Sequence, residues 1–558
     1  MLFRSRELQD RLGGEFPGRP DPAMAGWTIV DDETPGVTFG KGWHFSKCAN
    51  GEQVGNGAHF PPGGHSWGCN KKDDVECGEA VYPLPVAKAG RYAIKYRIPW
   101  VRDVGTDSET AIEIVSGARV EKIVVNQAIG TGLWREIGSF YLEPGAVLKI
   151  ISSRSRGVVV ADGFAISPVA GFTVDADMTA GNIVVDGIEG DTVKVRQDLR
   201  DSKDWFYWAF RVTGAAGRTL KFVFTDKYGG GPVGVRGPVV STDGGKTFSY
   251  PLDGKSRANG FAYSFGAGED DVLFYECHPY VRANWDAFVA KHSGDIGKKF
   301  VVETLCRSRK GADVPRARFG CIAREPKFRI FMSARHHCSE TMASWVLEGV
   351  GEAFLADDEL GRWLRENVEL MMVPLVDYDG AQAGDQGKVR KPHDHNRDYT
   401  EFLYPETKAI TEWIGSHAGG RLDMFIDVHC PWVRGKYNEW LYTPWKDPKI
   451  LPDVAAEHRF SALLEKLQCG TMRYRAADDL PFGKEWNKGI NYAQGWSGVI
   501  WACHKVKGLR IARSYEVPFA NANGAVVTPE TCRDLGRDTA KVFRAMLDEP
   551  SASRVALR

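Results

Sequence analysis

The sequence predicts a multidomain protein in which two N-terminal all-β domains precede an α/β domain with a central mixed sheet. Residues 27–290 contain short runs rich in β-branched and aromatic residues, with glycine-rich turns between them and no helical periodicity. From about residue 291, helical patterns alternate with apolar strand-like runs, which is typical of α/β domains. A length of 558 residues also favours two or three folded units over one.

The first all-β domain is expected at residues 1–170 and the second at residues 171–290. Strand-like runs of the first include "GRYAIKYRIPW", "TAIEIVS" and "VLKIISS", a pattern that favours a β-sandwich. The stretch "SPVAG" at 167–171 is the expected joint between the two. Strand-like runs of the second include "NIVVDGI", "TLKFVFTDKY" and "DVLFYECHPY". Both segments are therefore predicted to be built from strands.

The α/β domain is expected at residues 291–558. Four apolar runs predict its central strands: "KFRIFMSA", "LMMVPLVD", "LDMFIDVHC" and "LRIARSYEVPF". Helices are predicted at "ETMASWVLEGVGEAFLA", at "DELGRWLRENVE" and at "TPETCRDLGRDTAKVFRAML", which begins with a Thr-Pro helix-start signal. Ligands of such domains gather at the carboxyl ends of the strands, so candidate functional residues are sought there.

Charge and hydropathy exclude several classes of partner. Lys+Arg and Asp+Glu number 72 each, so the composition does not favour nucleic acid or a membrane surface. No apolar run approaches the roughly 20 residues that a membrane-spanning helix needs. The first residues lack the apolar stretch of a secretory signal, which predicts a cytoplasmic protein as the sequence stands, or a secreted or periplasmic one if the N-terminus has been trimmed.

Two of the predicted strand ends carry residues that could hold a metal. "ARHHCSE" follows the first apolar run, and "DVHC" ends the third. His337 and Glu340 are three residues apart, so both side chains can converge at a strand-to-helix turn, and His429 would come from a neighbouring strand. Two histidines and a glutamate are a known donor set of catalytic zinc, which needs three protein ligands and one open position. A zinc site is therefore one interpretation of this pattern, and a His-x-x-Glu spacing that arises by chance is the other.

Other residues of the same two segments could also be ligands. His336 shares a face with Glu340 if the segment is already helical, and Cys338 and Cys430 each adjoin a proposed ligand. A thiolate would make the site closed and structural, and neither spacing fits a zinc-thiolate motif. Packing beside the site is the preferred interpretation of both cysteines. Asp427, two residues before His429, is a candidate supporting partner of a ligand, with a structural role equally open.

The run "ARHHCSETMASWVLEGV" resembles the AR-x-H-P-G-E-T-x-A-S signature of zinc carboxypeptidases, and the branch it is most similar to is that of the cytosolic carboxypeptidases. Further motifs follow in the same order: "MMVPLVDYDG", "GKVRKPHDHNRDY", "DMFIDVHC" and "ARSYEVP". Cys338-Ser339 replaces the proline-glycine of the signature. Residues 171–290 resemble the β domain that precedes the catalytic domain in that branch, and residues 27–168 resemble golvesin-type β-sandwich modules.

The resemblance implies roles for individual residues. It implies one Zn²⁺ per chain, held by His337, Glu340 and His429, and it assigns the general base to Glu516. It implies that Arg390 polarises the scissile carbonyl, although the gap from Arg390 to Asn396 is shorter than the family pattern. Asn396 and Arg397 would hold the terminal carboxylate of the substrate. Tyr492 and Tyr515 are both candidates for the tyrosine that covers the substrate, and the sequence does not choose between them.

The resulting interpretation is a zinc metallocarboxypeptidase that hydrolyses the C-terminal peptide bond of peptides or proteins. One alternative is a zinc amide hydrolase or deacylase acting on a modified or non-peptide substrate such as a glycopeptide or peptidoglycan fragment. The other is a catalytically silent binding protein. The expected partner is a peptide or protein C-terminus, with a glycan or cell-wall ligand open for the N-terminal module.

Overall fold

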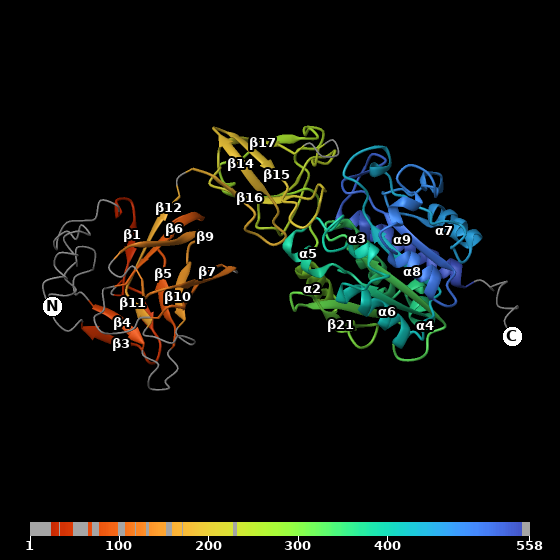
Figure 1. The fold of residues 1–558 in the computed structure, drawn as a ribbon, viewed down its shortest axis with the longest axis horizontal. Helices are drawn as coiled ribbons and strands as arrows, with labels where there is room; N and C mark the ends of the chain where they lie inside the picture. Colours follow the sequence, from red (N-terminus) through yellow and green to blue (C-terminus); the bar gives the residue numbers. More distant parts are fainter. Residues whose placement is uncertain are drawn as a thin grey trace. The chain divides into compact units, whose positions relative to one another are not determined.

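The structure is a computed structural model that describes residues 24–32, 34–47, 65–69, 78–98, 107–117, 119–129, 133–151, 159–169, 171–226 and 231–548. The chain forms two compact units (Figure 1): unit 1 is Met1–Thr173 with Thr213–Ala216, and unit 2 is Val174–Val212 with Gly217–Arg558. The predicted strands of residues 171–290 thus lie mostly in the same unit as the α/β region. The division into three domains stays a prediction.

Unit 1 is built from strands in the part that the structure describes. Strong alternation explains them: in Thr110–Ser116, every second residue of "TAIEIVS" is buried, so one face of the strand joins the core and the other faces outward. Three sheets have the orders β1-β12-β6-β9, β2-β5-β10-β7-β8 and β11-β4-β3. The strands are β1 Thr28–Val30, β2 Thr38–Phe39, β3 His44–Lys47, β4 His65–Cys69, β5 Ala80–Pro83, β6 Gly90–Arg97, β7 Thr110–Ser116, β8 Arg119–Val125, β9 Arg135–Leu142, β10 Val147–Ile151, β11 Val159–Ala161 and β12 Gly163–Pro168.

Two further four-stranded sheets follow, with orders β13-β16-β20-β18 and β14-β15-β17-β19. Aromatic rings pack between their strands, as between Phe210 and Phe222 with ring centroids 5.0 Å apart. The strands are β13 Thr173–Asp175, β14 Val184–Glu189, β15 Thr192–Arg196, β16 Ala209–Thr213, β17 Thr219–Phe224, β18 Val239–Ser241, β19 Gly260–Ser264 and β20 Asp271–Tyr275.

The α/β region is organised around a six-stranded mixed sheet of order β21-β22-β24-β23-β25-β26. Strands β23 to β26 run parallel, whereas β21 and β22 are antiparallel neighbours at one edge. Every residue of β24, β25 and β26 is buried, as expected for parallel strands covered on both faces. The strands are β21 Phe300–Arg307, β22 Asp313–Gly320, β23 Phe328–Ala334, β24 Val368–Val373, β25 Met424–His429 and β26 Ile511–Glu516, followed by a small hairpin of β27 Asn521–Ala522 and β28 Ala525–Val526. The four predicted central strands are confirmed as β23 to β26.

Helices cover this sheet. They are α2 Arg282–Lys291, α3 Met342–Leu355, α4 Glu359–Asn367, α5 Tyr378–Ala383, α6 Pro405–His417, α7 Val454–Leu467, α8 Gly498–Lys505 and α9 Pro529–Leu547. The Thr-Pro signal is confirmed as the start of α9, where the side chain of Thr528 accepts a hydrogen bond from the backbone of Thr531. Among the described helices, none combines the length and the apolar character needed to cross a bilayer.

Helices α3 and α9 pack closely through glycine. A Cβ on Gly349 would lie 2.0 Å from the carbonyl oxygen of Arg533, and one on Gly536 would lie 2.2 Å from that of Val346. Only glycine fits where two helix backbones approach this closely. The pair holds α3 against the sheet, and α3 directly follows the loop that carries "RHHCSE".

The β segment before the α/β region shares its core. Phe206 packs edge-to-face on Trp432 and on Phe519, with ring centroids 4.8 and 5.3 Å apart. Tyr280 lies in the same buried cluster and packs on Trp345 of α3. The β segment of unit 2 that carries Phe206 and Tyr280 is therefore part of the framework that supports the carboxyl ends of the central strands.

Candidate metal centre and active site

The loop between β23 and α3 is held by a buried arginine. Arg335 has a positive φ of 70° and is 2% exposed. Its guanidinium donates to the carbonyl oxygen of Cys338 at 2.6 Å and to that of Tyr280 at 2.7 Å. These bonds close the loop on itself and tie it to the preceding β segment, so that the two histidines after Arg335 project from a fixed turn.

His337, Glu340 and His429 converge at the carboxyl ends of β23 and β25. Nδ1 of His337 lies 2.7 Å from Oε1 of Glu340, and Nδ1 of His429 lies 2.7 Å from Oε2 of the same carboxylate. All three residues are at most 4% exposed. Two imidazole nitrogens and one carboxylate within 4.8 Å of one another match the donor set of a catalytic zinc site. The three sequence-predicted ligands thus lie together.

Charge pairing dominates this cluster. Burial opposes ionisation of Glu340, but His337 and His429 outweigh it and lower the pKa of the carboxyl to about 2. Burial also disfavours a charged His429, but Asp427 and Glu340 outweigh it and hold its pKa well above the usual value. A dication bound by the same atoms would replace these protons as the positive charge opposite Glu340.

Each metal-facing imidazole has a carboxylate at its other nitrogen. Nε2 of His337 lies 3.2 Å from Oδ1 of Asp394, and Nε2 of His429 lies 2.6 Å from Oδ2 of Asp427. Such carboxylates fix the tautomer of a metal-binding histidine and raise its basicity. The contact of Asp427 matches the supporting role considered from the sequence. Sequence reasoning misses Asp394, although its place two residues before Asn396 in a candidate motif is a usable signal.

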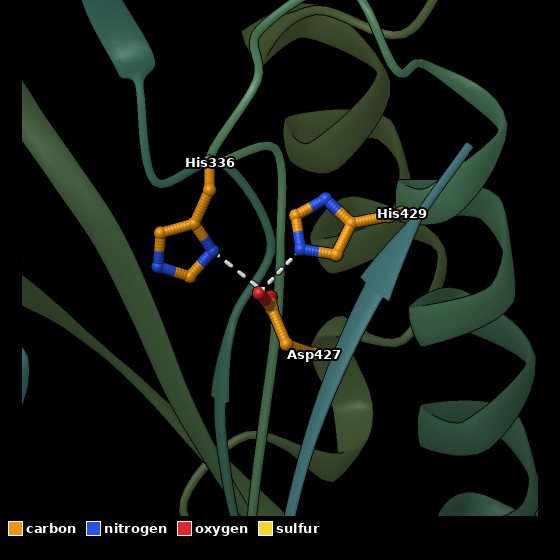
Figure 2. A group of neighbouring side chains, drawn as sticks. All are labelled: His336, Asp427 and His429. Atoms are coloured by element: carbon orange, nitrogen blue, oxygen red, sulfur yellow. Dashed lines mark hydrogen bonds and ion pairs between the residues drawn. The ribbon is translucent and has the colours of Figure 1, made fainter. Parts of the chain in front are cut away.

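His336 belongs to a second, connected group (Figure 2). Its Nδ1 lies 2.9 Å from Oδ1 of Asp427, whose other oxygen meets His429, so both imidazoles are directed at one carboxylate. Nε2 of His336 lies 2.7 Å from the hydroxyl of Tyr399, and the hydroxyl of Ser333 donates to Asp427 at 2.8 Å. His336 and Asp427 are both fully buried. They could also chelate a metal with His429, but that position is enclosed by hydrogen-bonding partners, which suits support of His429 better than catalysis.

The two neighbouring cysteines are poorly suited to be ligands. The Cys338 thiol donates to the carbonyl oxygen of Asp385 at 3.1 Å. Burial raises the pKa of both the Cys338 and the Cys430 thiols well above the usual value, which disfavours the thiolate that binds metal.

Glu516 ends β26 and pairs in register with His429 at the end of β25. It is 8% exposed. Burial raises the pKa of its carboxyl to about 7; Glu340 acts in the same direction, whereas His429 and Lys388 oppose the rise. A carboxyl with a pKa near neutrality beside these three candidate ligands is suited to accept and return a proton.

Asn396 and Arg397 lie in the short 3₁₀ helix His395–Arg397 beside the cluster. Nδ2 of Asn396 is 3.1 Å from Nε2 of His429. Arg397 is 7% exposed and donates to the carbonyl oxygens of Asn491 and Asn396 at 2.8 and 2.7 Å. Its guanidinium lies over the ring of Tyr492, 5.0 Å from the centroid.

The structure separates the two candidate tyrosines. Tyr492 is partly exposed and stacks on Arg397. Tyr515 is fully buried, and burial raises the pKa of its hydroxyl to about 12. Neighbouring residues of a strand point to opposite faces, so Tyr515 turns away from the side on which Glu516 lies. Tyr492 alone of the pair is placed to meet a ligand.

Arg390 is surrounded by acidic side chains. It donates twice to Asp201, at 3.0 and 2.5 Å, and once to Asp385 at 3.1 Å. It also donates to Asp377, whose side chain caps α5 by accepting from the backbone of Gly380 at 3.0 Å. Through these bonds Arg390 connects the β segment to the start of α5, which is a structural role. Its predicted part in polarising a carbonyl stays a prediction that these contacts do not support.

Comparisons with known proteins agree with the sequence motifs. No protein-family model matches the chain. Over 148 residues the chain is 26% identical to cytosolic carboxypeptidase 3 of Mus musculus, a match that covers 26% of this chain and 15% of that protein. The chain thus spans far less than two thirds of this relative.

Two solved structures are similar in fold. A metallo-carboxypeptidase from Burkholderia cenocepacia is 20% identical with a TM-score of 0.56, covering 68% of this chain and 99% of that one. A metallo-carboxypeptidase from Pseudomonas aeruginosa, solved in complex with (2-guanidinoethylmercapto)succinic acid, is 22% identical with a TM-score of 0.51, covering 67% and 99%.

These structures show that the fold is carboxypeptidase-like, with its central mixed sheet and surrounding helices. Neither of them bears on the golvesin-like module, which stays a prediction. The similarity to cytosolic carboxypeptidases agrees with the ordered motifs and supports the resemblance to zinc carboxypeptidases.

Proposed function

We propose that the protein is a zinc-dependent metallocarboxypeptidase that hydrolyses the C-terminal peptide bond of a peptide or protein. The observation that carries this proposal is the convergence of His337, Glu340 and His429 at the strand ends, with Glu516 in register beside His429. Zinc in this donor set would supply Lewis acidity toward a water molecule and the scissile carbonyl. The remaining chemistry falls to residues of the chain.

Glu516 is proposed as the general base. As a water oxygen bonds to the carbonyl carbon, the carboxylate of Glu516 takes the proton of that water. It then returns the proton to the departing amine as the C–N bond breaks. A pKa of about 7 suits both directions of transfer, because the group is neither too weak a base nor too weak an acid.

Arg397 and Asn396 are proposed to hold the terminal carboxylate of the substrate. A guanidinium offers a planar fork that matches a carboxylate, and its stacking on Tyr492 fixes its plane. Asn396 contacts His429, so a carboxylate held there would lie near the metal ligands. Such a clamp selects chain ends, since only the last residue carries a free main-chain carboxylate.

Removal and return of the metal tests this proposal. Chelator-treated protein is assayed with and without one equivalent of zinc. Each sample is incubated with a free-acid peptide or with the same peptide amidated at its C-terminus, and the product masses are measured by mass spectrometry. We expect loss of single residues from the free-acid peptide only, and only with zinc. The same assay on Glu516→Gln should show no cleavage with zinc, and Glu401→Gln, at an exposed acid, is the matched control. No cleavage by the zinc-loaded protein, or internal cleavage of both peptides, would contradict the proposal.

A further inference from the structure

Hydrolysis of an amide places negative charge on the carbonyl oxygen, and a preformed cation near that oxygen is worth much to catalysis. The family resemblance gives this part to Arg390. In the structure, three carboxylates, those of Asp201, Asp377 and Asp385, accept from the Arg390 guanidinium. Moving it toward a substrate would leave these buried or half-buried acids without their partner, which costs more than the new contact returns.

Lys388 contacts one of the three candidate metal ligands. Its Nζ is 3.3 Å from Nε2 of His337 and 3.8 Å from Oδ2 of Asp394. Its charge is also one of those that oppose the raised pKa of Glu516, so the ammonium acts on the proposed base as well. The side chain is 22% exposed, which leaves it access to a ligand.

A bound metal changes what Lys388 can contact. With a metal at Nδ1 of His337, Nε2 would donate to Asp394 and would no longer accept a hydrogen bond from Lys388. The Lys388 ammonium has three donor hydrogens on a flexible side chain, and without Nε2 of His337 it would have one acceptor fewer. The carbonyl oxygen of a substrate in this site would be an acceptor for the ammonium, and it would gain negative charge as the C–N bond is hydrolysed.

Arg390 helps to hold the loop that carries Lys388. The backbone of Lys203 donates to the carbonyl oxygen of Val389 at 3.3 Å, and that of Lys391 donates to the carbonyl oxygen of Asp201 at 2.9 Å. Together with the ion pairs of Arg390, these bonds hold the segment that follows Lys388. Val389 has a positive φ of 49°, so the chain turns sharply between the two cations.

We propose that Lys388, and not Arg390, is the catalytic cation that hydrogen-bonds the reacting carbonyl oxygen, and that Arg390 is a positioning residue for the loop. This inference rests on the proposed carboxypeptidase function. Lys388 keeps its protons throughout: the water proton goes to Glu516 and then to the leaving amine, while the ammonium only donates a hydrogen bond. Its contribution appears as the negative charge forms and disappears when the product carboxylate leaves.

The test compares zinc-loaded Lys388→Ala, Lys388→Arg and Arg390→Lys with wild type, using Lys408→Ala at an exposed lysine of α6 as control. Readouts are zinc content, melting temperature, kcat, KM, and inhibition by a phosphonate peptide that mimics the tetrahedral oxyanion. For Lys388→Ala we expect full zinc, a kcat lower by about 10²–10³ with KM little changed, and phosphonate affinity weakened by a similar factor. Lys388→Arg should recover much of the loss, and Lys408→Ala should match wild type.

Arg390→Lys should lower the melting temperature, and its effect on kcat should be small compared with that of Lys388→Ala. The inference is overturned if Lys388→Ala keeps kcat within about threefold of wild type, or loses kcat only in proportion to lost zinc. It is also overturned if Arg390→Lys alone weakens the phosphonate while zinc and melting temperature stay unchanged. Failure of the proposed function looks different, because then zinc-loaded wild type itself does not cleave the free-acid peptide.

Discussion

Replacement of Glu516 by glutamine removes the proposed base with little change of shape. The amide has nearly the volume of the carboxyl, and the site is buried, with Glu516 8% exposed. Glu516 is not one of the three residues assigned to the metal, so zinc should remain at one per chain. What the amide cannot do is take the proton of the attacking water.

The size of the effect follows from what a positioned base contributes. General acid–base catalysis supplies about 10²–10⁴ in rate, which corresponds to about 3 to 5 kcal/mol of barrier. The direction of the pH dependence follows from the raised pKa. The base must be deprotonated, so activity of wild type should rise as pH rises through the pKa of Glu516, about 7 without metal. A bound dication favours the carboxylate and moves this limb to lower pH.

The assay measures kcat on a free-acid peptide across pH for wild type, Glu516→Gln and the Glu401→Gln control, with zinc determined on the same samples. We expect Glu516→Gln to hold zinc, to lose at least about 10² in kcat, and to lose the acidic limb of the profile. More than a tenth of wild-type kcat with full zinc would refute the reasoning. Loss of zinc would place Glu516 among the ligands instead.

Three further outcomes are expected. His337→Ala should abolish stoichiometric zinc, whereas His336→Ala should keep it but weaken its affinity by about 10–100-fold through Asp427, measured by chelator competition; equal losses would show that both histidines are ligands. Arg397→Ala should lower kcat/KM for free-acid peptides far more than for amides, and equal effects in a paired assay would mean that the clamp lies elsewhere. A chain lacking residues 1–170 should keep activity on small peptides and its melting transition; an insoluble or inactive product would show that these residues belong to the core.

The sequence predicts that the candidate metal ligands lie together, because the strand patterns and the motifs that carry them are both short, local features. Apolar runs of four to eight residues locate β23 to β26, and parallel strands bring their carboxyl ends to one edge. His429 and Glu516 each end such a run, so their meeting is a consequence of register. The choice between Tyr492 and Tyr515 needed the structure, which places Glu516 at the end of β26 and its neighbour Tyr515 on the opposite side of the strand.

The roles of loop residues are harder to predict from the sequence, because spacing along a loop does not determine the direction of each side chain. The segment 387–397 contains Lys388, Arg390 and Asp394 within a few residues, and only the structure shows that Arg390 is bound by acids contributed from Asp201 and Asp385. Asp201 lies 189 positions away in the sequence. No local pattern carries information about such a partner, and for the same reason sequence reasoning misses Tyr399 as the support of His336.

X-ray absorption at the zinc edge tests the central claim most directly. Wild type loaded with one equivalent of zinc should show two imidazole nitrogens at about 2.0–2.1 Å with oxygen as the remaining neighbours, and His337→Ala should lose this signature. A sulfur neighbour at about 2.3 Å would place Cys338 or Cys430 on the metal and contradict the account. So would an unchanged spectrum in His337→Ala, because the metal would then lie outside the cluster of His337, Glu340 and His429.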